Sequence, residues 1–171
     1  YSDVYISTDC EEILSIYADH TSVVLKRRPS RLAEDKTSSE DVIIDLLNDP
    51  LVCEKGPKSF TLLQPTSPLR TYKHLQMASH VHIRNNLSPV ISSTSKTIDE
   101  VNTHSLHRLE DFSSFKPNGA FYMCCVEKFI EKKSFYYEDF YAFYLNENSS
   151  IDIDYAKDFE KAEKLFELRE I

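Results

Sequence analysis

The chain has 171 residues, of which 41% are hydrophobic, so it can build a core and is most simply one domain spanning residues 1–171. Its formal charge of −8 implies no basic face, which argues against nucleic acid as the main partner. No apolar run approaches the roughly 20 residues that cross a bilayer, so we expect no membrane partner.

Apolar periodicity predicts strands and helices that alternate along most of the chain. Strands are expected at residues 3–7, 22–26, 59–64, 88–95, 119–126 and 140–145, and helices at 8–20, 37–49, 72–86, 127–133 and from about Tyr155. Thr8 or Asp9 is expected to cap the first helix, and Ser38 with Asp41 resembles a capping box. Residues 96–114 are polar and are expected to be irregular.

This order of elements predicts an α/β sandwich of three layers, a mostly parallel sheet with helices on both faces. The last strands break the alternation, so we also expect an antiparallel element. Ligands bind beyond the carboxyl ends of the strands in such sheets. The segments that directly follow strands are therefore the candidate site.

The segment "SIDID" sets two carboxylates, Asp152 and Asp154, one residue apart. Residues two apart in an extended segment share a face, so these carboxylates lie together, opposite Ile151 and Ile153. Mg²⁺ is the natural occupant of such a pair, bound with phosphate oxygens of a substrate. The alternative is that Asp154 caps the last helix while Asp152 is solvated.

The segment "QPTSPLRT" follows a predicted strand and is stiffened by two prolines. Gln64 and Arg70 suit a polar ligand that carries a carboxylate or phosphate. An ordinary turn into a helix capped by Thr71 is the alternative. A second segment, with Arg27, Arg28 and Arg31, suits an anion or is simply solvated.

The four cysteines form no CxxC pair, and Cys124 and Cys125 are adjacent in an apolar strand. This spacing is typical of reduced thiols, so we expect a cytoplasmic protein and no zinc site.

Together and in this order, several motifs resemble those of the acylneuraminate cytidylyltransferases, or CMP-sialic acid synthetases. These motifs are "ISTD" (6–9), "RP…LAED…SS" (28–39), "LLQPTSPLR" (62–70), "KPNGAFY" (116–122) and "SIDID…DF" (150–159). The resemblance spans almost the whole chain, and "LLQPTSPLR" followed by "SIDID" is its most specific part.

The resemblance implies a nucleotide-diphospho-sugar transferase-like α/β fold, with a small antiparallel element that forms a homodimer. It implies Mg²⁺-dependent transfer of CMP from CTP to the anomeric hydroxyl of N-acetylneuraminate or a related nine-carbon acid, with release of pyrophosphate. Such a reaction serves lipopolysaccharide or capsule synthesis.

Individual roles follow from the same resemblance. Asp152 and Asp154 match the catalytic Mg²⁺ ligands, and Arg28 and Ser39 match positions that hold the cytidine part of CTP. The sugar side is matched by Gln64, Thr66, Ser67, Lys116, Asn118, Phe135 and Tyr136. Lys116 stands where the family usually has arginine, and the aromatic pair reaches the partner's site in the family dimer.

Two departures keep alternatives open. The family's N-terminal strand and its Gly/Lys/Arg-rich triphosphate loop have no counterpart in these 171 residues, and the 96–114 region lacks a clear basic sugar-binding motif. We expect that these segments are missing from the sequence, or that the chain is a truncated, non-catalytic homologue. Legionaminate, pseudaminate or an octulosonate is the alternative acceptor.

Overall fold

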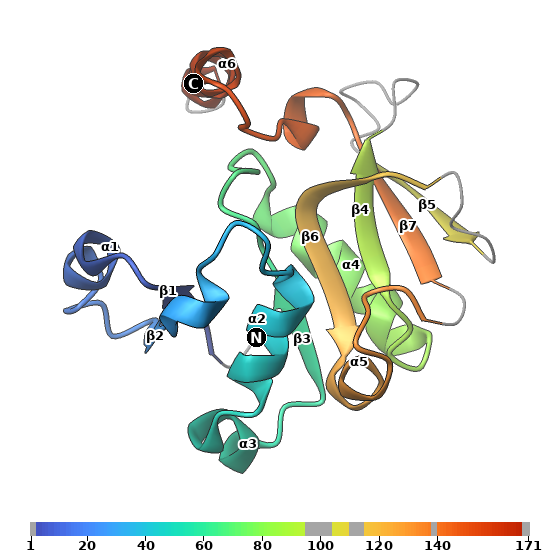
Figure 1. The fold of residues 1–171 in the computed structure, drawn as a ribbon. Coiled ribbons are helices and arrows are strands. Elements are labelled where there is room, and N and C mark those ends of the chain that lie inside the picture. Colours follow the sequence, from blue (N-terminus) through green and yellow to red (C-terminus); the bar gives the residue numbers. More distant parts are fainter. Residues whose placement is uncertain (1–2, 95–103, 110–114, 138–139, 169–171) are drawn as a thin grey trace. The chain divides into compact units, whose positions relative to one another are not determined.

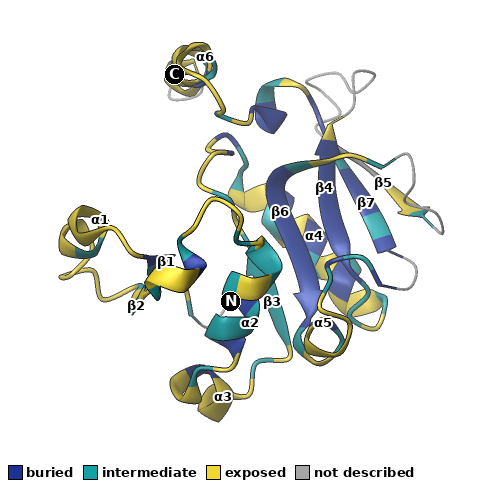
Figure 2. Cartoon of the chain, in the orientation of Figure 1, coloured by how far each residue is buried: buried dark blue, intermediate teal, exposed yellow. Residues whose placement is uncertain are grey.

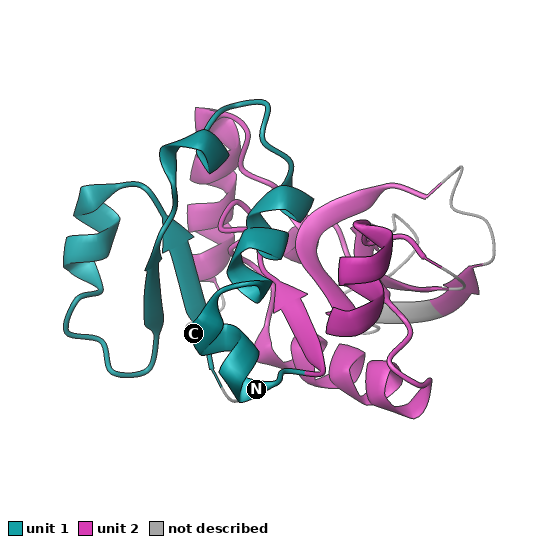
Figure 3. Cartoon of the chain, turned by 60° about the horizontal axis from the view of Figure 1, so that its bottom comes forward, with its two compact units in different colours: residues 1–57 teal, residues 58–171 magenta. Residues whose placement is uncertain are grey.

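The structure is a computed structural model that describes residues 3–94, 104–109, 115–137 and 140–168. It contains two compact units, residues 1–57 and 58–171 (Figure 3). Each unit is described by itself, and the expectation of one domain over the whole chain stays a prediction.

The first unit is built on two short parallel strands, β1 (Tyr5–Thr8) and β2 (Val24–Arg27), with helix α1 (Glu11–Ile16) between them in sequence. Thr8 or Asp9 was expected to cap α1, but neither residue does so. The N-cap is Cys10, without a side-chain hydrogen bond, because the Thr8 hydroxyl instead accepts from the Cys10 backbone N–H.

A single 3₁₀ turn, η1 (Ser30–Leu32), leads to helices α2 (Ser39–Leu47) and α3 (Pro50–Lys55). The Ser38 hydroxyl accepts from the Asp41 backbone N–H at 3.1 Å, so the predicted N-cap of α2 is confirmed. Helix α3 was not predicted, although Asp49 caps it and Pro50 stands in its first turn, as proline favours.

The second unit contains a five-stranded sheet in the order β3-β6-β4-β7-β5 (Figure 1). The strands are β3 (Ser59–Leu62), β4 (Val90–Thr94), β5 (His104–Leu109), β6 (Pro117–Cys125) and β7 (Phe140–Leu145). The helices are α4 (Tyr72–Arg84), α5 (Val126–Lys132) and α6 (Ala156–Glu167), with a 3₁₀ turn η2 (Asn148–Ser150).

The expectation of a mostly parallel sheet is wrong for this unit. Only β4 and β7 pair in parallel, whereas β3–β6, β6–β4 and β7–β5 are antiparallel, so the sheet is mixed. Parallel neighbours need a long crossover, usually helical. No helix was predicted between β4 and β6, and β6 enters the sheet in the opposite direction.

The expected irregular region is also corrected in part. His104–Leu109 form β5, the strand at the edge of the sheet beside β7. The strand was missed because its sequence "HSLHRL" shows only weak apolar alternation. The rest of the 96–114 range lies outside the described residues.

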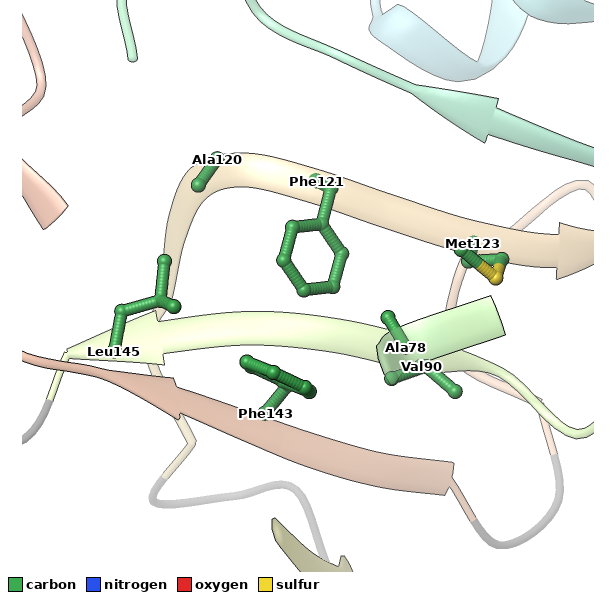
Figure 4. Close-up of a cluster of buried hydrophobic side chains, with 7 residues drawn as sticks. All are labelled: Ala78, Val90, Ala120, Phe121, Met123, Phe143 and Leu145. Carbon is green, nitrogen blue, oxygen red and sulfur yellow. The ribbon is translucent and has the colours of Figure 1, made fainter. Parts of the chain in front are cut away.

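Helices cover both faces of this sheet, as predicted. On one face α4 packs Leu75, Ala78 and Val81 against a buried cluster that also contains Val90, Ala120, Phe121, Met123, Phe143 and Leu145 (Figure 4). On the other, the Phe129 ring of α5 packs edge-to-face on Phe60 and tilted on Phe135, with ring centroids 4.8 and 5.1 Å apart. Figure 2 accordingly shows β4, β6 and β7 as mostly buried.

Candidate functional site at one edge of the sheet

The polar loops of the second unit gather at one edge of its sheet. Strands β3, β4 and β7 run in one direction and end at this edge, where β6 begins, since β6 is antiparallel to both β3 and β4. The segments 63–71, 115–119 and 146–155 therefore meet there (Figure 1). This agrees with the expectation that the candidate site lies beyond strand ends.

The loop after β3 is held in shape from within. Arg70 Nη1 donates to the backbone carbonyls of Gln64 and Ser67 at 2.7 and 2.6 Å. Burial lowers the pKa of this guanidinium, which remains charged because arginine starts from a very high value. Nη1 of Arg70 therefore fixes the loop, and its contact with a ligand stays a prediction.

Ser67 ties this loop to the start of β6. Its side chain is fully buried, and its hydroxyl donates to the Asn118 carbonyl at 3.3 Å. The backbone N–H of Ser67 donates to the Gln64 carbonyl, which closes the turn. Of the three predicted sugar-side residues in this loop, Thr66 is exposed, Gln64 half-buried and Ser67 enclosed.

The segment that carries Asp152 and Asp154, here called the carboxylate segment, is fixed against the same loop. The Ile153 backbone N–H donates to the Thr66 carbonyl at 2.8 Å. Ile151 and Ile153 pack into a cluster with Leu69 and with Ala162 and Leu165 of α6. The predicted alternation is therefore confirmed, since the isoleucines point inward and both aspartates are exposed.

Asp154 does not cap the last helix, so that alternative is wrong. The N-cap of α6 is Tyr155, whose backbone N–H donates to the Asp158 carboxylate at 3.0 Å. Neither Asp152 nor Asp154 has a hydrogen bond or ion pair with another described residue. Two carboxylates on one face without a cation fit the donor set that Mg²⁺ prefers.

The metal would have to find its other ligands elsewhere. Among the described residues, no group of three or more His, Cys, Asp or Glu side chains could hold a metal ion. Two protein carboxylates completed by substrate oxygens and water is a common arrangement for Mg²⁺, whereas zinc needs three or four protein ligands.

Lys116 and Asn118 flank this edge from the β6 side. Lys116 is exposed, and its carbonyl accepts from the Ser93 hydroxyl at 2.6 Å. Asn118 donates from Nδ2 to the Thr94 hydroxyl at 3.4 Å and accepts on Oδ1 from the Ala120 N–H. The Asn118 amide is thus partly engaged by β4 and by its own strand.

The two predicted aromatic residues, Phe135 and Tyr136, differ in burial. Phe135 is only 4% exposed, and its ring packs on Tyr122 and Phe129 of its own unit. Tyr136 is half-buried and lies beside Phe115 and Phe140. The ring of Phe135 belongs to the core of this chain.

Arg28 and Ser39, the predicted nucleotide-binding residues, lie in the first unit. The Arg28 guanidinium donates to the Ser7 carbonyl and to its hydroxyl, the latter at 3.4 Å, which places it at the end of β1. Ser39 is the first residue of α2. The structure gives no contact between Arg28 and Ser39.

The other two arginines of the basic segment are paired. Arg27 forms an ion pair with Glu11, which lowers the pKa of that carboxyl, and Arg31 pairs with Asp45 at 2.7 Å. Arg27 and Arg31 also line a shallow depression of about 590 Å³ in this unit, where Lys26 pairs with Asp49. The segment is thus not a set of unpaired cations.

The "NG" dipeptide at 118–119 predicts a turn, but Gly119 lies in β6 and against Gln64. A Cβ on Gly119 would stand 2.3 Å from Gln64 Oε1 and 3.3 Å from Ser67 Oγ. The signal was present, since "NG" marks a turn and Gly119 has a φ of +78°. The contact partner could not be predicted, because it lies 55 residues away in the chain.

The second unit is thus an α/β unit with a mixed sheet, and two exposed carboxylates, an amide and hydroxyls form its candidate site at the ends of the strands. No protein-family model matches the chain. It is 31% identical over 184 residues to the CMP-N,N'-diacetyllegionaminic acid synthase of Legionella pneumophila, covering 98% of this chain and 79% of that protein.

It is also 30% identical over 173 residues to the N-acylneuraminate cytidylyltransferase of Streptococcus agalactiae serotype V, covering 92% of this chain. The corresponding protein of Escherichia coli O18:K1:H7 is 28% identical over 179 residues. The chain belongs to the acylneuraminate cytidylyltransferase family. It spans 41% of the length of these two N-acylneuraminate cytidylyltransferases.

Within the described part of the chain, no helix is both long and apolar enough to cross a membrane. Cys10, Cys53, Cys124 and Cys125 form no disulfide; the first two are exposed and the last two are buried.

Proposed function

We propose that this chain carries the nucleotidyl-transfer region of an enzyme that moves CMP from CTP to an acidic nine-carbon sugar. The observation that carries the proposal is the pair Asp152 and Asp154, exposed and unneutralised, beside the loop that presents Gln64 and Thr66. The names of the relatives, cytidylyltransferase and CMP-sugar synthase, support the same reaction.

In this reaction the anomeric hydroxyl of the sugar attacks the α-phosphorus of CTP, and the bond to pyrophosphate breaks. Such a transfer needs alignment of the two substrates and neutralisation of charge more than covalent participation by the protein. Mg²⁺, when bound, supplies positive charge to the triphosphate. Asp152 and Asp154 would hold that ion, so they are the proposed catalytic residues.

The remaining residues would bind and orient the substrates. Gln64 and Thr66 offer an amide and a hydroxyl to the sugar, while Ser67, being buried, supports their loop. Lys116 would face the sugar carboxylate as a point charge, without the bidentate geometry of arginine. Asn118 would contact the sugar from the same side, and Arg28 and Ser39 the cytidine part of CTP.

A second candidate acceptor is a legionaminate. The observation that favours it is the alignment with the legionaminic acid synthase, which covers 79% of that relative against 41% of the N-acylneuraminate cytidylyltransferases. Pseudaminate and an octulosonate are further acceptors to include, and a non-catalytic homologue is the remaining alternative.

The test measures pyrophosphate release by the full-length native protein with CTP, Mg²⁺ and each sugar in turn. We expect release only when all three are present. Asp154→Asn is expected to lower turnover at least about 100-fold, because the pair loses a charged metal ligand, while far-UV circular dichroism stays unchanged.

Asp19→Asn, at an exposed aspartate outside the site, is the matched control and should keep full turnover. Full activity of Asp154→Asn would contradict the metal assignment. No turnover with any sugar, together with no CTP binding by calorimetry, would identify a non-catalytic homologue.

We also propose an oligomeric state and a cellular compartment for the protein. A homodimer would follow the family pattern, with Tyr136 rather than the buried Phe135 available to a partner. The free cysteines support a reducing compartment such as the cytoplasm. Light scattering of the full-length protein tests the first, and a monomer at micromolar concentration would contradict it.

A further inference from the structure

Gly119 lies near the start of β6, where that strand meets the loop after β3. Its φ of +78° is one that other residues rarely adopt, and its α-carbon faces the Gln64 side chain. A Cβ built there would stand 2.3 Å from Gln64 Oε1, which is far inside van der Waals contact. Any side chain at this position therefore has to displace something.

The contacts of the loop decide what moves. The Gln64 backbone is fixed, because its carbonyl accepts from Arg70 Nη1 and from the Ser67 N–H. Ser67 is fixed in turn by its hydrogen bond to the Asn118 carbonyl. The Gln64 amide is the far end of a flexible side chain, so the displacement falls on that amide.

We propose that Gly119 is a positioning residue that acts through Gln64. The missing side chain leaves the space that the Gln64 amide occupies, and so sets where that amide lies at the edge that also carries Thr66 and the carboxylate segment. An amide offers both a donor and an acceptor, which suits the hydroxyl and acylamino groups of a sugar acid. This inference rests on the proposed function, in which Gln64 contacts the sugar.

Substitution of Gly119 has two separable effects, strain at positive φ and collision with Gln64. Gly56 provides the matched control, because it has a similar φ of +57° but a Cβ on it would meet no atom within 4 Å. Gly56→Ala therefore reproduces the strain without the collision. When Gly119→Ala is combined with Gln64→Ala, the Gln64 amide is absent, so the strain at positive φ remains without the collision with that amide.

The experiment compares the steady-state kinetics of Gly119→Ala, Gly56→Ala, Gln64→Ala and the Gln64→Ala/Gly119→Ala double variant. We expect Gly119→Ala to raise the sugar KM about fivefold or more, as for one lost hydrogen bond, with kcat and the KM for CTP within about twofold of wild type. Gly56→Ala should leave all three unchanged.

In the Gln64→Ala background, Gly119→Ala should add less than about a twofold change, since the collision is gone. An undiminished effect in that background would overturn the proposal, as would an equal rise of the sugar KM in Gly56→Ala. If Gly119→Ala does not fold, Gly119→Asn replaces it, because asparagine tolerates positive φ while still carrying a Cβ.

A second readout does not depend on turnover. The side-chain amide signal of Gln64 in a ¹H–¹⁵N spectrum, assigned by its loss in Gln64→Ala, should shift in Gly119→Ala and stay in place in Gly56→Ala. An unmoved signal in both overturns the positioning role. A protein that lacks activity but shows the shift contradicts the proposed function alone.

Discussion

At the scale of single residues, the site is shaped by groups that do not face a ligand. Arg70 looks like an anion contact in sequence, yet it donates to two carbonyls of its own loop. Ser67 looks like a ligand contact, and the structure shows that its side chain is buried. The orientation of Arg70 depends on carbonyls of its own loop, and that of Ser67 on the start of β6.

Arg70→Met is expected to lower the free energy of unfolding by about 1–3 kcal/mol, because it removes the donor to the Ser67 carbonyl and one of the two donors to the Gln64 carbonyl. Chemical denaturation followed by fluorescence measures the loss. Arg84→Met, at an exposed arginine of α4, should stay within about 0.5 kcal/mol of wild type. Equal losses in the two variants would contradict the bracing role.

At the scale of elements, the alternative in which Asp154 is the N-cap of α6 is wrong. Both Asp154 and Asp158 stand near the start of α6, and a cap at either residue is compatible with the sequence. In the structure Tyr155 is the N-cap, and Asp158, three residues on, accepts from the Tyr155 N–H as in a capping box. Asp154 is thereby left for the proposed metal.

Asp158→Ala is therefore expected to destabilise the first turn of α6 by about 0.5–1 kcal/mol, because it removes both the acceptor of the Tyr155 N–H and a favourable charge at the helix N-terminus. Faster amide hydrogen exchange in residues 155–159 would show it. Asp154→Asn should leave these exchange rates unchanged. The reverse pattern would mean that Asp154 is the cap after all.

At the scale of the whole molecule, His82 connects three elements of the second unit. It lies on α4 and is 2% exposed. Its Nδ1 donates to the Ser88 carbonyl at 2.7 Å before β4, so its Nε2 accepts from the Ser59 hydroxyl of β3 at 2.8 Å. Burial lowers the pKa of His82 below its ordinary value of 6.5, although the Ser88 carbonyl opposes this.

The consequence is a loss of stability on the acid side. Above pH 6.5 His82 is neutral in both states, whereas below it the unfolded chain takes up a proton that the folded chain resists. The free energy of unfolding should therefore fall as the pH falls below 6.5. Denaturation at pH 7.5, 6.5 and 5.5 measures the slope.

His82→Gln should flatten this slope, at the cost of lower stability at pH 7.5. His80→Gln, at an exposed histidine of the same helix, should keep it. An unchanged slope in His82→Gln would show that other groups govern the acid response.

The sequence by itself determined most elements and the chemistry of the candidate site. Period-2 and period-3.6 patterns are local, so β3, β4, β6, β7 and most helices were predicted near their observed places, and "SIDID" was predicted to expose both aspartates. Short elements such as α3 and β5 were missed, because their sequences show only weak apolar periodicity.

Only the tertiary structure decided the direction of the strands and the partners of the site residues. The placement of β6 between β3 and β4, and the contacts of Ile153 with Thr66 and of Gly119 with Gln64, join segments far apart in the chain. Such contacts depend on how strands pair and on what space remains between them, which no local pattern encodes.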